Sequence, residues 1–238
     1  FRVRGTGNRG INVTINGIPY NDAESLGTFF VNLQDFSSSI QSVQLQRGVG
    51  TSTNGAGAFG ASLNILTDAA TLEAYAEVNA SGGSFDTRRA NVKFGTGLIN
   101  DHFTFSGRLS AIKSDGYVDR ASSDLKSYYL QGEYRNEKTL LKAVVFGGHE
   151  VTYQSWNGID AQTLATDRTY NPIGFQYDDD GNFEGFYDNQ VDDYKQDHVQ
   201  LHWNQKYGGG WSTQLSLNYT MGRGFFEEYV DSWYYANV

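Results

Sequence analysis

The stretch QRGVGTSTNGAGAFGASLNILT, residues 46–67, decides how the rest of the chain is interpreted. Five glycines interrupt it, namely Gly48, Gly50, Gly55, Gly57 and Gly60. Glycine permits positive φ angles and close approach of backbones, and residues 61–67 then alternate like a strand. A segment with so little side-chain bulk cannot form a core alone. We therefore expect it to fold tightly against a wall supplied by the rest of the protein.

Two nucleotide-site interpretations of this stretch fail on the residues that come after the glycines. Gly55, Gly57 and Gly60 satisfy G-x-G-x-x-G, but a dinucleotide site needs a helix to begin there, and residues 61–67 predict a strand. A phosphate-binding loop needs Gly-Lys-Ser/Thr after its glycines, and this tripeptide is absent there. A plain glycine-rich surface loop remains as the alternative, and the flanking motifs argue against it.

Four separated motifs surround or close the stretch. They are Arg4-Gly5, the turn Asn16-Gly17-Ile18-Pro19, the strand that ends at Arg47-Gly48, and GAGAFGASLNILT at residues 55–67. In this order and spacing they resemble the plug domain of TonB-dependent outer-membrane receptors. The resemblance covers the opening part of the chain by motif and the remainder by strand pattern. It implies a plug domain at residues 1–68, of which this is the C-terminal portion.

The composition fits strands that face lipid on one side and water on the other. Charged residues make up 19% of the chain and aromatic residues 15%, with 28 Gly and 2 Pro. No run of about 18 apolar residues occurs, which excludes a transmembrane helix. A membrane is not excluded, because a barrel strand needs only about 9 to 11 alternating residues.

The charge, the cysteine count and the first residues limit the function further. The chain has no cysteine, so disulfide and thiolate–metal frameworks are excluded. The net charge of −9 argues against a nucleic-acid partner, which would require a clustered basic face. Residues 1–4 already alternate like a strand, without an initiating Met or a signal sequence, and we expect the chain to be part of a longer polypeptide.

After residue 68 the sequence predicts seven strands. They are residues 72–80, 90–98, 103–111, 128–134, 141–145, 199–203 and 211–221, of which the fifth is the least regular. No charged residue occurs on their apolar faces, as expected for a lipid-facing surface where Lys or Arg costs about 2–4 kcal/mol. A soluble sandwich would also keep charge from its inner face, so this observation supports a membrane only in part.

Connection lengths separate the barrel from the sandwich. The turns at residues 100–101, 136–138 and 207–210 are tight, whereas the connections at 82–87, 114–126 and 151–194 are longer. Outer-membrane barrels alternate in this way, and a sandwich has no reason to. Aromatic residues near the tight turns predict a periplasmic girdle: Phe103, Tyr134, Trp203, Tyr207 and Trp211. The fold prediction is an antiparallel transmembrane β-barrel, partial, with about seven strands of some 22 in residues 69–238, enclosing a small mixed α/β plug.

No catalytic constellation is present, and two metal hypotheses are weak. His198 and His202 share a strand face, but no third ligand lies near them in sequence, and ordinary lumen polarity is the alternative. Asp178, Asp179 and Asp180 precede a glycine in an acidic loop, which offers oxygen ligands for calcium. The ligand order of an EF-hand is absent, and a hydrated acidic turn is favoured. We therefore predict no enzyme activity, no cofactor and no required metal.

The long connection at residues 151–194 is rich in aromatic rings that suit ligand binding. Tyr153, Trp156, Tyr170 and Tyr177 are predicted to contact substrate, because stiff amphipathic rings give contact area at low entropic cost. The equal alternative is that these rings pack within the loop. The resemblance adds plug turns that face substrate, carried here by Asn8, Arg9, Tyr20, Asn21 and Asp22. It also implies that Arg4 and Arg47 seat the plug through carboxylates of the barrel wall.

The resemblance implies active transport. A TonB-dependent receptor of the bacterial outer membrane binds a scarce solute, here an iron chelate such as a siderophore, a vitamin or a similar molecule, and imports it. Its partners would be the TonB energy-transducing complex, acting through a segment absent from this sequence, outer-membrane lipid, the chelate ligand, and in some receptors a surface lipoprotein. The alternatives are a soluble β-rich carbohydrate-binding or adhesive module and, more weakly, an outer-membrane enzyme barrel.

Overall fold

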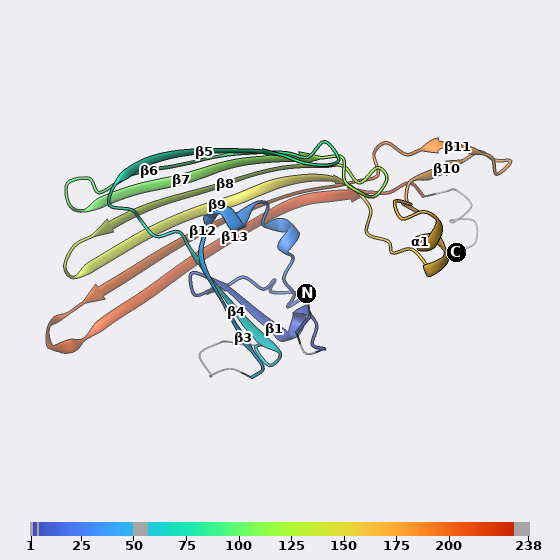
Figure 1. The fold of residues 1–238 in the computed structure, drawn as a ribbon. Helices are drawn as coiled ribbons and strands as arrows, with labels where there is room; N and C mark the ends of the chain where they lie inside the picture. Colours follow the sequence, from blue (N-terminus) through green and yellow to red (C-terminus); the bar gives the residue numbers. More distant parts are fainter. Residues whose placement is uncertain (1, 4, 50–56, 231–238) are drawn as a thin grey trace.

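The C-terminal part of the chain forms one long, curved antiparallel sheet of seven strands (Figure 1). The computed structural model describes residues 2–3, 5–49 and 57–230. The strands are β5 (Ala74–Gly82), β6 (Arg88–Thr96), β7 (Phe103–Ser114), β8 (Ser123–Arg135), β9 (Thr139–Tyr153), β12 (Val191–Lys206) and β13 (Ser212–Glu227). The predicted mainly-β, antiparallel fold is confirmed. In the described residues the sheet is open, with β5 and β13 as its edges.

Short turns lie at one end of the strands and long connections at the other, as the spacing predicts (Figure 1). The turn between β6 and β7 places Asn100 and Asp101 at φ 48° and 59°, a left-handed conformation that these two residue types tolerate. The longest connection carries α1 (Ala161–Thr166) and the hairpin β10 (Phe175–Tyr177) and β11 (Phe183–Phe186). No helix among the described residues is long and apolar enough to cross a membrane.

The N-terminal part forms a separate four-stranded sheet in the order β2-β1-β4-β3. Its strands are β1 (Ile11–Ile15), β2 (Ile18–Pro19), β3 (Ile40–Arg47) and β4 (Ala61–Thr67), where β1 and β4 run parallel. Its helical turns are 3-10: η1 (Asn8–Gly10), η2 (Phe30–Asn32) and η3 (Phe36–Ser39). We call residues 2–68 of this part, as far as they are described, the N-terminal unit. The predicted mixed α/β character is wrong there, because segments of three or four residues are too short to nucleate an α-helix.

The deciding stretch supplies a central strand of the N-terminal unit. Residues 61–67 form β4, as predicted, between β1 and β3. Just before it, the Gly60 N–H donates to the Gly10 carbonyl at 2.8 Å, and a Cβ on Gly60 would lie 2.9 Å from that same oxygen. Glycine is therefore required there for close approach of two backbones. Residues 50–56, which include Gly50 and Gly55, lie outside the described part of the chain.

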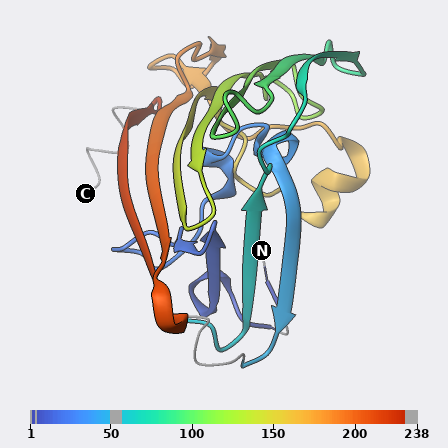
Figure 2. The same cartoon turned by 90° about the vertical axis from the view of Figure 1, so that its left-hand side faces the viewer.

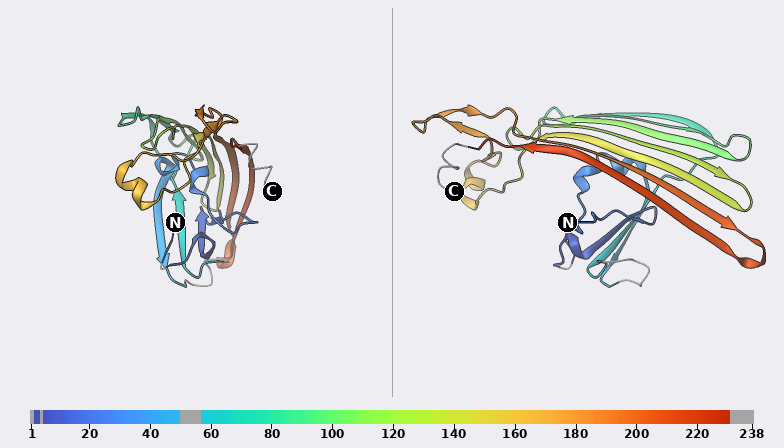
Figure 3. Two further views of the ribbon diagram at one scale, coloured as in Figure 1. Left: turned by 90° about the vertical axis from the view of Figure 1, so that its right-hand side faces the viewer. Right: turned by 180° about the vertical axis from the view of Figure 1, so that it is seen from behind.

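The N-terminal unit packs against the concave face of the large sheet (Figures 2 and 3). The shared core places Ile15, Ile65 and Phe36 against Val144 and Phe146 of β9. The rings of Phe36 and Phe146 are 5.0 Å apart between centroids. Because Val144 and Phe146 are apolar and point inward, β9 is apolar on both faces in its middle. This explains why its sequence shows the least regular alternation.

The convex face of the large sheet is apolar and exposed. Its exposed side chains come from all seven strands and include Val78, Val92, Phe94, Phe105, Leu109, Leu130, Leu141, Val199, Leu201, Leu217 and Tyr219. The concave face is polar and buried, and it includes Asn91, Thr104, Arg108, Ser110, Gln131, Glu150, His198, Gln200 and His202. The apolar face predicted from the sequence is thus the outer face of the sheet.

The strands extend further toward the long connections than the alternation predicts, and there the convex face becomes charged. Lys126, His149, Lys195 and Arg223 form one row across β8, β9, β12 and β13. His149 pairs with Asp193 at 2.8 Å, and Lys195 pairs with Asp197 at 3.4 Å. The absence of charge on the outward face therefore holds for the predicted segments but not for the added ends of these strands.

Candidate functional site

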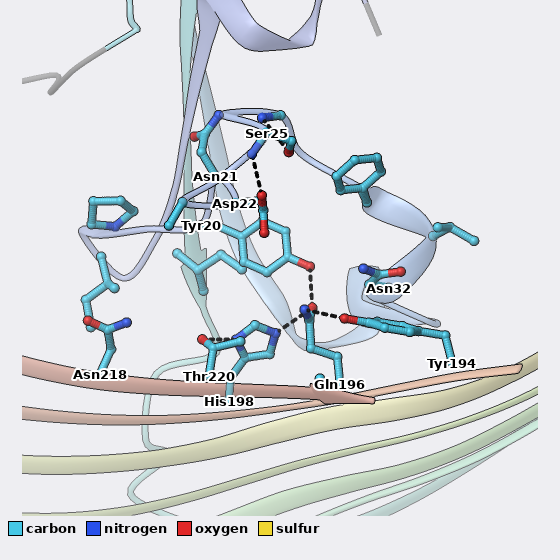
Figure 4. A pocket seen from close by; sticks show the side chains of 18 of the residues that line it. Tyr20, Asn21, Asp22, Ser25, Asn32, Tyr194, Gln196, His198, Asn218 and Thr220 are labelled. Atoms are coloured by element: carbon cyan, nitrogen blue, oxygen red, sulfur yellow. Dashed lines mark hydrogen bonds between the residues drawn. The ribbon is translucent and has the colours of Figure 1, made fainter. Parts of the chain in front are cut away.

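A cavity of about 740 Å³ lies between the N-terminal unit and the concave face of the large sheet (Figure 4). One side is formed by residues 18–32, and the other by inward-facing residues of β9, β12 and β13. Its size falls in the range of sites that enclose a small molecule, about 300–1,000 Å³. This cavity is the candidate binding site.

The loop on one side of the cavity is held rigid by two side chains. Asn21 accepts a hydrogen bond from the Val13 N–H at 2.7 Å and donates to the carbonyls of Ile11 at 2.9 Å and Leu26 at 3.0 Å. Asp22 accepts from the Ser25 N–H at 2.7 Å and from the Glu24 N–H at 3.1 Å. The hydrogen bonds from Ser25, and then that from Glu24, hold the pKa of Asp22 below its usual value. Asp22 therefore stays ionised at neutral pH.

The opposite wall is a hydrogen-bonded row of side chains centred on Gln196 (Figure 4). The Gln196 Oε1 atom lies 3.3 Å from the Tyr20 hydroxyl and 3.1 Å from His198 Nε2. Its Nε2 atom donates to the Tyr194 hydroxyl at 3.3 Å, and His198 Nδ1 lies 3.0 Å from the Thr220 hydroxyl. Burial raises the pKa of the Tyr20 hydroxyl, so this group remains a neutral donor. This row of side chains around Gln196 therefore offers neutral hydrogen-bonding groups rather than an activated nucleophile.

An ionic anchor beside the cavity joins the N-terminal unit to the large sheet. Arg89 of β6 donates to both carboxylate oxygens of Asp35, at 3.1 and 2.8 Å, in a bidentate pair. Arg108 of β7 lies 3.4 Å from the same carboxylate and donates to Ser39 at 2.7 Å. The Ser110 hydroxyl also donates to Asp35. Arg108 is 1% exposed, so its charge depends on these partners.

Further polar contacts fix the N-terminal unit along the concave face. Asn16 donates to Gln200 Oε1 at 3.0 Å, and the Tyr129 hydroxyl bonds Thr67 at 2.7 Å. Gln34 donates to the buried Glu150 at 3.2 Å. The seating role of Arg4 and Arg47 stays a prediction. Arg47 is exposed at the end of β3 and makes no ion pair within the described residues, while Arg4 lies outside them.

The predicted substrate residues of the N-terminal unit divide into two groups. Tyr20, Asn21 and Asp22 line the cavity. Asn8 and Arg9 belong to η1, where the Asn8 side chain lies beside Gly27 and Arg9 is exposed. The role of all five in substrate binding stays a prediction.

The predicted aromatic residues of the long connection lie away from the cavity and pack together. Phe175 contacts Tyr170, Tyr177 and Phe186, with centroids 5.9, 6.3 and 4.9 Å apart. The Arg120 guanidinium lies 3.7 Å above the Phe186 ring and also over Tyr153, a cation–π arrangement. In a separate contact, the ring of Trp156 lies 6.1 Å from that of Phe226. The packing alternative is therefore realised, while ligand binding by these rings stays a prediction.

The candidate metal ligands are engaged in local hydrogen bonds. Asp178 accepts from the backbone N–H groups of Asp180 at 3.0 Å and Asn182 at 2.7 Å, which closes the acidic turn. These bonds, above all those from Asn182, hold the pKa of Asp178 below its usual value. His202 lies 2.9 Å from the Ser216 hydroxyl, and His198 lies 3.0 Å from the Thr220 hydroxyl. Within the described residues, no three His, Cys, Asp or Glu side chains gather in a metal-binding group.

The residues that sequence reasoning missed are Asp35, Arg89 and Arg108, together with the wall residues Tyr194, Gln196 and Thr220. The available signal is that Arg89, Lys93 and Arg108 point inward on neighbouring strands. Inward cations require acidic partners, and Lys93 finds one in Asp68 at 3.0 Å, as Arg89 does in Asp35.

No family model and no curated protein matches the chain. Solved structures do match it. The alcaligin outer-membrane receptor FauA of Bordetella pertussis aligns with a TM-score of 0.65 and 14% identity, over 91% of this chain and 31% of that one. The ferric-catecholate import receptor Fiu of E. coli K12 aligns with a TM-score of 0.66 and 16% identity, over 92% of this chain and 33% of that one. The siderophore receptor PiuA of Acinetobacter baumannii aligns with a TM-score of 0.68 and 10% identity, over 93% of this chain and 30% of that one.

These likenesses show the fold. The chain has the arrangement of strands found in part of an outer-membrane siderophore receptor, and it spans about a third of the length of each receptor named above. The matching proteins are transport receptors rather than enzymes.

Proposed function

We propose that the chain is part of a TonB-dependent receptor of the bacterial outer membrane that binds an iron chelate and imports it. In this proposal residues 1–68, which include the N-terminal unit, are the C-terminal portion of the plug, and residues 69–238 are the first strands of the barrel. The observation that carries the proposal is the distribution of side chains on the large sheet, which is the reverse of that in a soluble protein. We call it the inverted sheet. Its outer face is apolar and exposed, and its inner face is polar and covered by the N-terminal unit.

The inverted sheet supports a membrane location for a physical reason. Leu109, Leu217 and Tyr219 are 54%, 54% and 66% exposed on the convex face. In water, each exposed apolar side chain of this size forgoes about 1.5–3 kcal/mol of burial free energy. In lipid the same side chains meet an apolar solvent, and all backbone groups between the sheet edges are paired. The matching structures are receptors for iron chelates, and the proposed ligand class rests on them.

The site geometry suggests how binding and transport would be connected. A chelate in the cavity would contact Tyr20 and Asp22 of the N-terminal unit and Gln196 and Thr220 of the wall at the same time. Binding would therefore affect the interface between the two parts. Opening a path requires separation of Asp35 from Arg89 and Arg108, which is costly because it leaves buried charges without their partners. An external source of work, such as TonB, is consistent with this arrangement.

The test measures uptake of radioactive iron by cells that carry the intact protein in the outer membrane and lack other iron-chelate receptors. Asn218 lines the cavity on β13, and Gln214 points to the same side of that strand but does not line the cavity. We expect Asn218→Trp to fill the site and reduce uptake by about tenfold or more, while Gln214→Trp leaves it unchanged. Uptake should also disappear in cells without TonB.

Two results would contradict the proposed function. One is recovery of the intact protein from the soluble fraction without detergent, as expected for the alternative carbohydrate-binding or adhesive module. The other is the absence of TonB-dependent uptake for iron chelates of every charge when the protein is shown to be folded in the membrane.

A further inference from the structure

Among Asp, Glu, Lys and Arg, only acidic residues line the cavity within the described part of the chain. They are Asp22, Glu150 and Asp192. No Lys or Arg lines the cavity in the part of the chain that the structure describes. A site built for an anionic ligand normally presents Arg or Lys, because these supply charge-assisted hydrogen bonds to the ligand oxygens. The composition of this lining is the opposite.

The inward-facing basic residues of β6 and β7 are not free to turn toward the cavity. Arg89 and Arg108 are held by Asp35, and Lys93 is held by Asp68. Each of these acidic partners belongs to the N-terminal unit or follows its last strand. The cations of β6 and β7 therefore serve the contact with that unit, and the charge that a ligand meets is set by the acidic residues.

Several polar side chains of the cavity have no hydrogen-bond partner among the described residues. The side chains of Asn32, Asn218 and Asp192 make no hydrogen bond with other described residues, although all three line the cavity (Figure 4 labels the two asparagines). Two amides and a carboxylate offer both donors and acceptors, so a ligand with amide, hydroxyl or ammonium groups would satisfy them. These groups therefore favour ligands that can form hydrogen bonds, in addition to the preference for ligand charge.

The connection between β9 and β12, which lies at the end of the strands nearest the cavity, is also acidic. Between residues 154 and 190, Arg168 is the single basic residue, whereas the acidic ones include Asp178, Asp179 and Asp180. A field of one sign at an entrance raises the local concentration of oppositely charged ligands and lowers that of like-charged ligands. The approach and the cavity thus favour the same ligand charge.

We infer that the cavity selects neutral or cationic iron chelates that present hydrogen-bonding groups, such as ferric trihydroxamates, and disfavours polyanionic chelates such as ferric tricatecholates. The inference rests on the proposed function and specifies the ligand class of the same site. Its physical basis is like-charge repulsion in a partly enclosed cavity, which discriminates against the wrong ligand as well as favouring the right one.

The experiment compares three probes in cells that carry the intact protein: a neutral ferric trihydroxamate, a cationic ferric trihydroxamate and a ferric tricatecholate. We expect uptake of the two trihydroxamates and at least about tenfold weaker uptake of the tricatecholate. The double variant Asp22→Asn, Asp192→Asn should narrow this ratio severalfold. Asn at position 22 still accepts the hydrogen bonds that close the turn, so the loop geometry is retained.

The control is Asp101→Asn, which removes the same kind of charge at the tight turn between β6 and β7, at the far end of the strands from the long connections. It should leave the ratio unchanged. Uptake of the tricatecholate equal to or better than that of the trihydroxamates would overturn the inference while leaving the proposed function intact. An unchanged ratio in the double variant would also overturn it. The absence of uptake for all three probes would contradict both the inference and the proposed function.

Discussion

The convex and concave faces of the large sheet obey opposite rules. On the convex face, leucines and aromatic residues are exposed, whereas on the concave face Arg108 and Glu150 are 1% exposed. A soluble protein buries apolar groups and leaves charges in water. Here the polar groups are buried because a second part of the same chain covers them and supplies hydrogen-bond partners to several of them, Arg108 and Glu150 among them. The contrast shows that the two faces have different surroundings, and a change made on one face can be compared with a change made on the other.

The largest expected effect comes from the concave face. Asp35→Ala removes the acidic partner of Arg89 and leaves Arg108 buried without its counter-charge. We expect the N-terminal unit to lose about 3–5 kcal/mol of stability against release from the sheet. The measurement is the urea concentration at which this unit becomes sensitive to protease, for the intact protein in detergent micelles.

A matched ion pair on the surface provides the control for this prediction. Asp86 and Arg88 are 2.7 Å apart, but their side chains are 56% and 76% exposed. Asp86→Ala should change stability by less than about 1 kcal/mol, because exposed pairs are weak. Equal losses of stability in the two variants would show that burial on the concave face does not make the Asp35 ion pairs stronger than an exposed pair.

The second prediction concerns the convex face. Leu217→Lys places a charge in the middle of the exposed apolar band of β13 and should cost about 2–4 kcal/mol if that band faces lipid. Gln214→Lys, on the opposite face of the same strand, should be tolerated. The fraction of protein that resists heat denaturation in detergent on a gel measures folding into the membrane. Equal folding of both variants would argue that the convex face meets water.

A smaller effect is expected from a single hydroxyl on the concave face. The Tyr129 side chain is 2% exposed, and its hydroxyl lies 2.7 Å from both Thr67 and Gln131. Tyr129→Phe should cost about 1–1.5 kcal/mol, because it leaves buried polar partners unsatisfied. Tyr134→Phe loses only a bond with the exposed Asn136 and should change stability by less than about 0.5 kcal/mol. Urea unfolding of the two variants under identical conditions measures the difference.

The strands and their faces were predictable because that information is local. Each outward residue in the apolar band meets the same surroundings, so alternation in stretches such as residues 211–221 identifies the strand and its exposed face. β9 was least clear because Phe146 points inward against Phe36 of a distant segment. The outer ends of the strands were missed because charges such as Lys195 are tolerated there, and the alternation rule no longer applies.

The site was predictable only on one side. Tyr20, Asn21 and Asp22 come after a recognisable Asn-Gly turn, the resemblance predicts that they face substrate, and in the structure they line the cavity. Gln196 and Thr220 look like any inward polar residue of a strand, and the contact of Gln196 with Tyr20 joins residues that are 176 positions apart in the sequence. Asp35 resembles an ordinary turn residue, and its pairing with Arg89 is equally non-local. Composition and periodicity carry no information about such pairings.

The smallest expected effect is a pH dependence of the ionic anchor. Burial alone would raise the pKa of Asp35, but hydrogen bonds from Arg89, Ser110 and Ser38 outweigh it and lower this pKa below the usual 3.8. A carboxylate with a lowered pKa stabilises the folded state fully above its unfolded pKa, and the stabilisation is lost as the pH falls through the folded pKa. Asp35 therefore stabilises the contact to the same extent at every pH between 7 and about 5. We expect it to add no pH dependence to the urea midpoint for release of the N-terminal unit in this range.

Below about pH 4 the same midpoint should fall in the wild-type protein, and the fall should be smaller in Asp35→Ala, which has no carboxylate at this position to protonate. Comparison of the two proteins isolates Asp35 from the other acidic residues, since both carry all of them. A wild-type midpoint that already falls between pH 7 and 5, with no such fall in the variant, would mean that Asp35 titrates above its usual value. The concave face would then hold this carboxylate weakly, and the contrast between the two faces would rest on apolar packing alone.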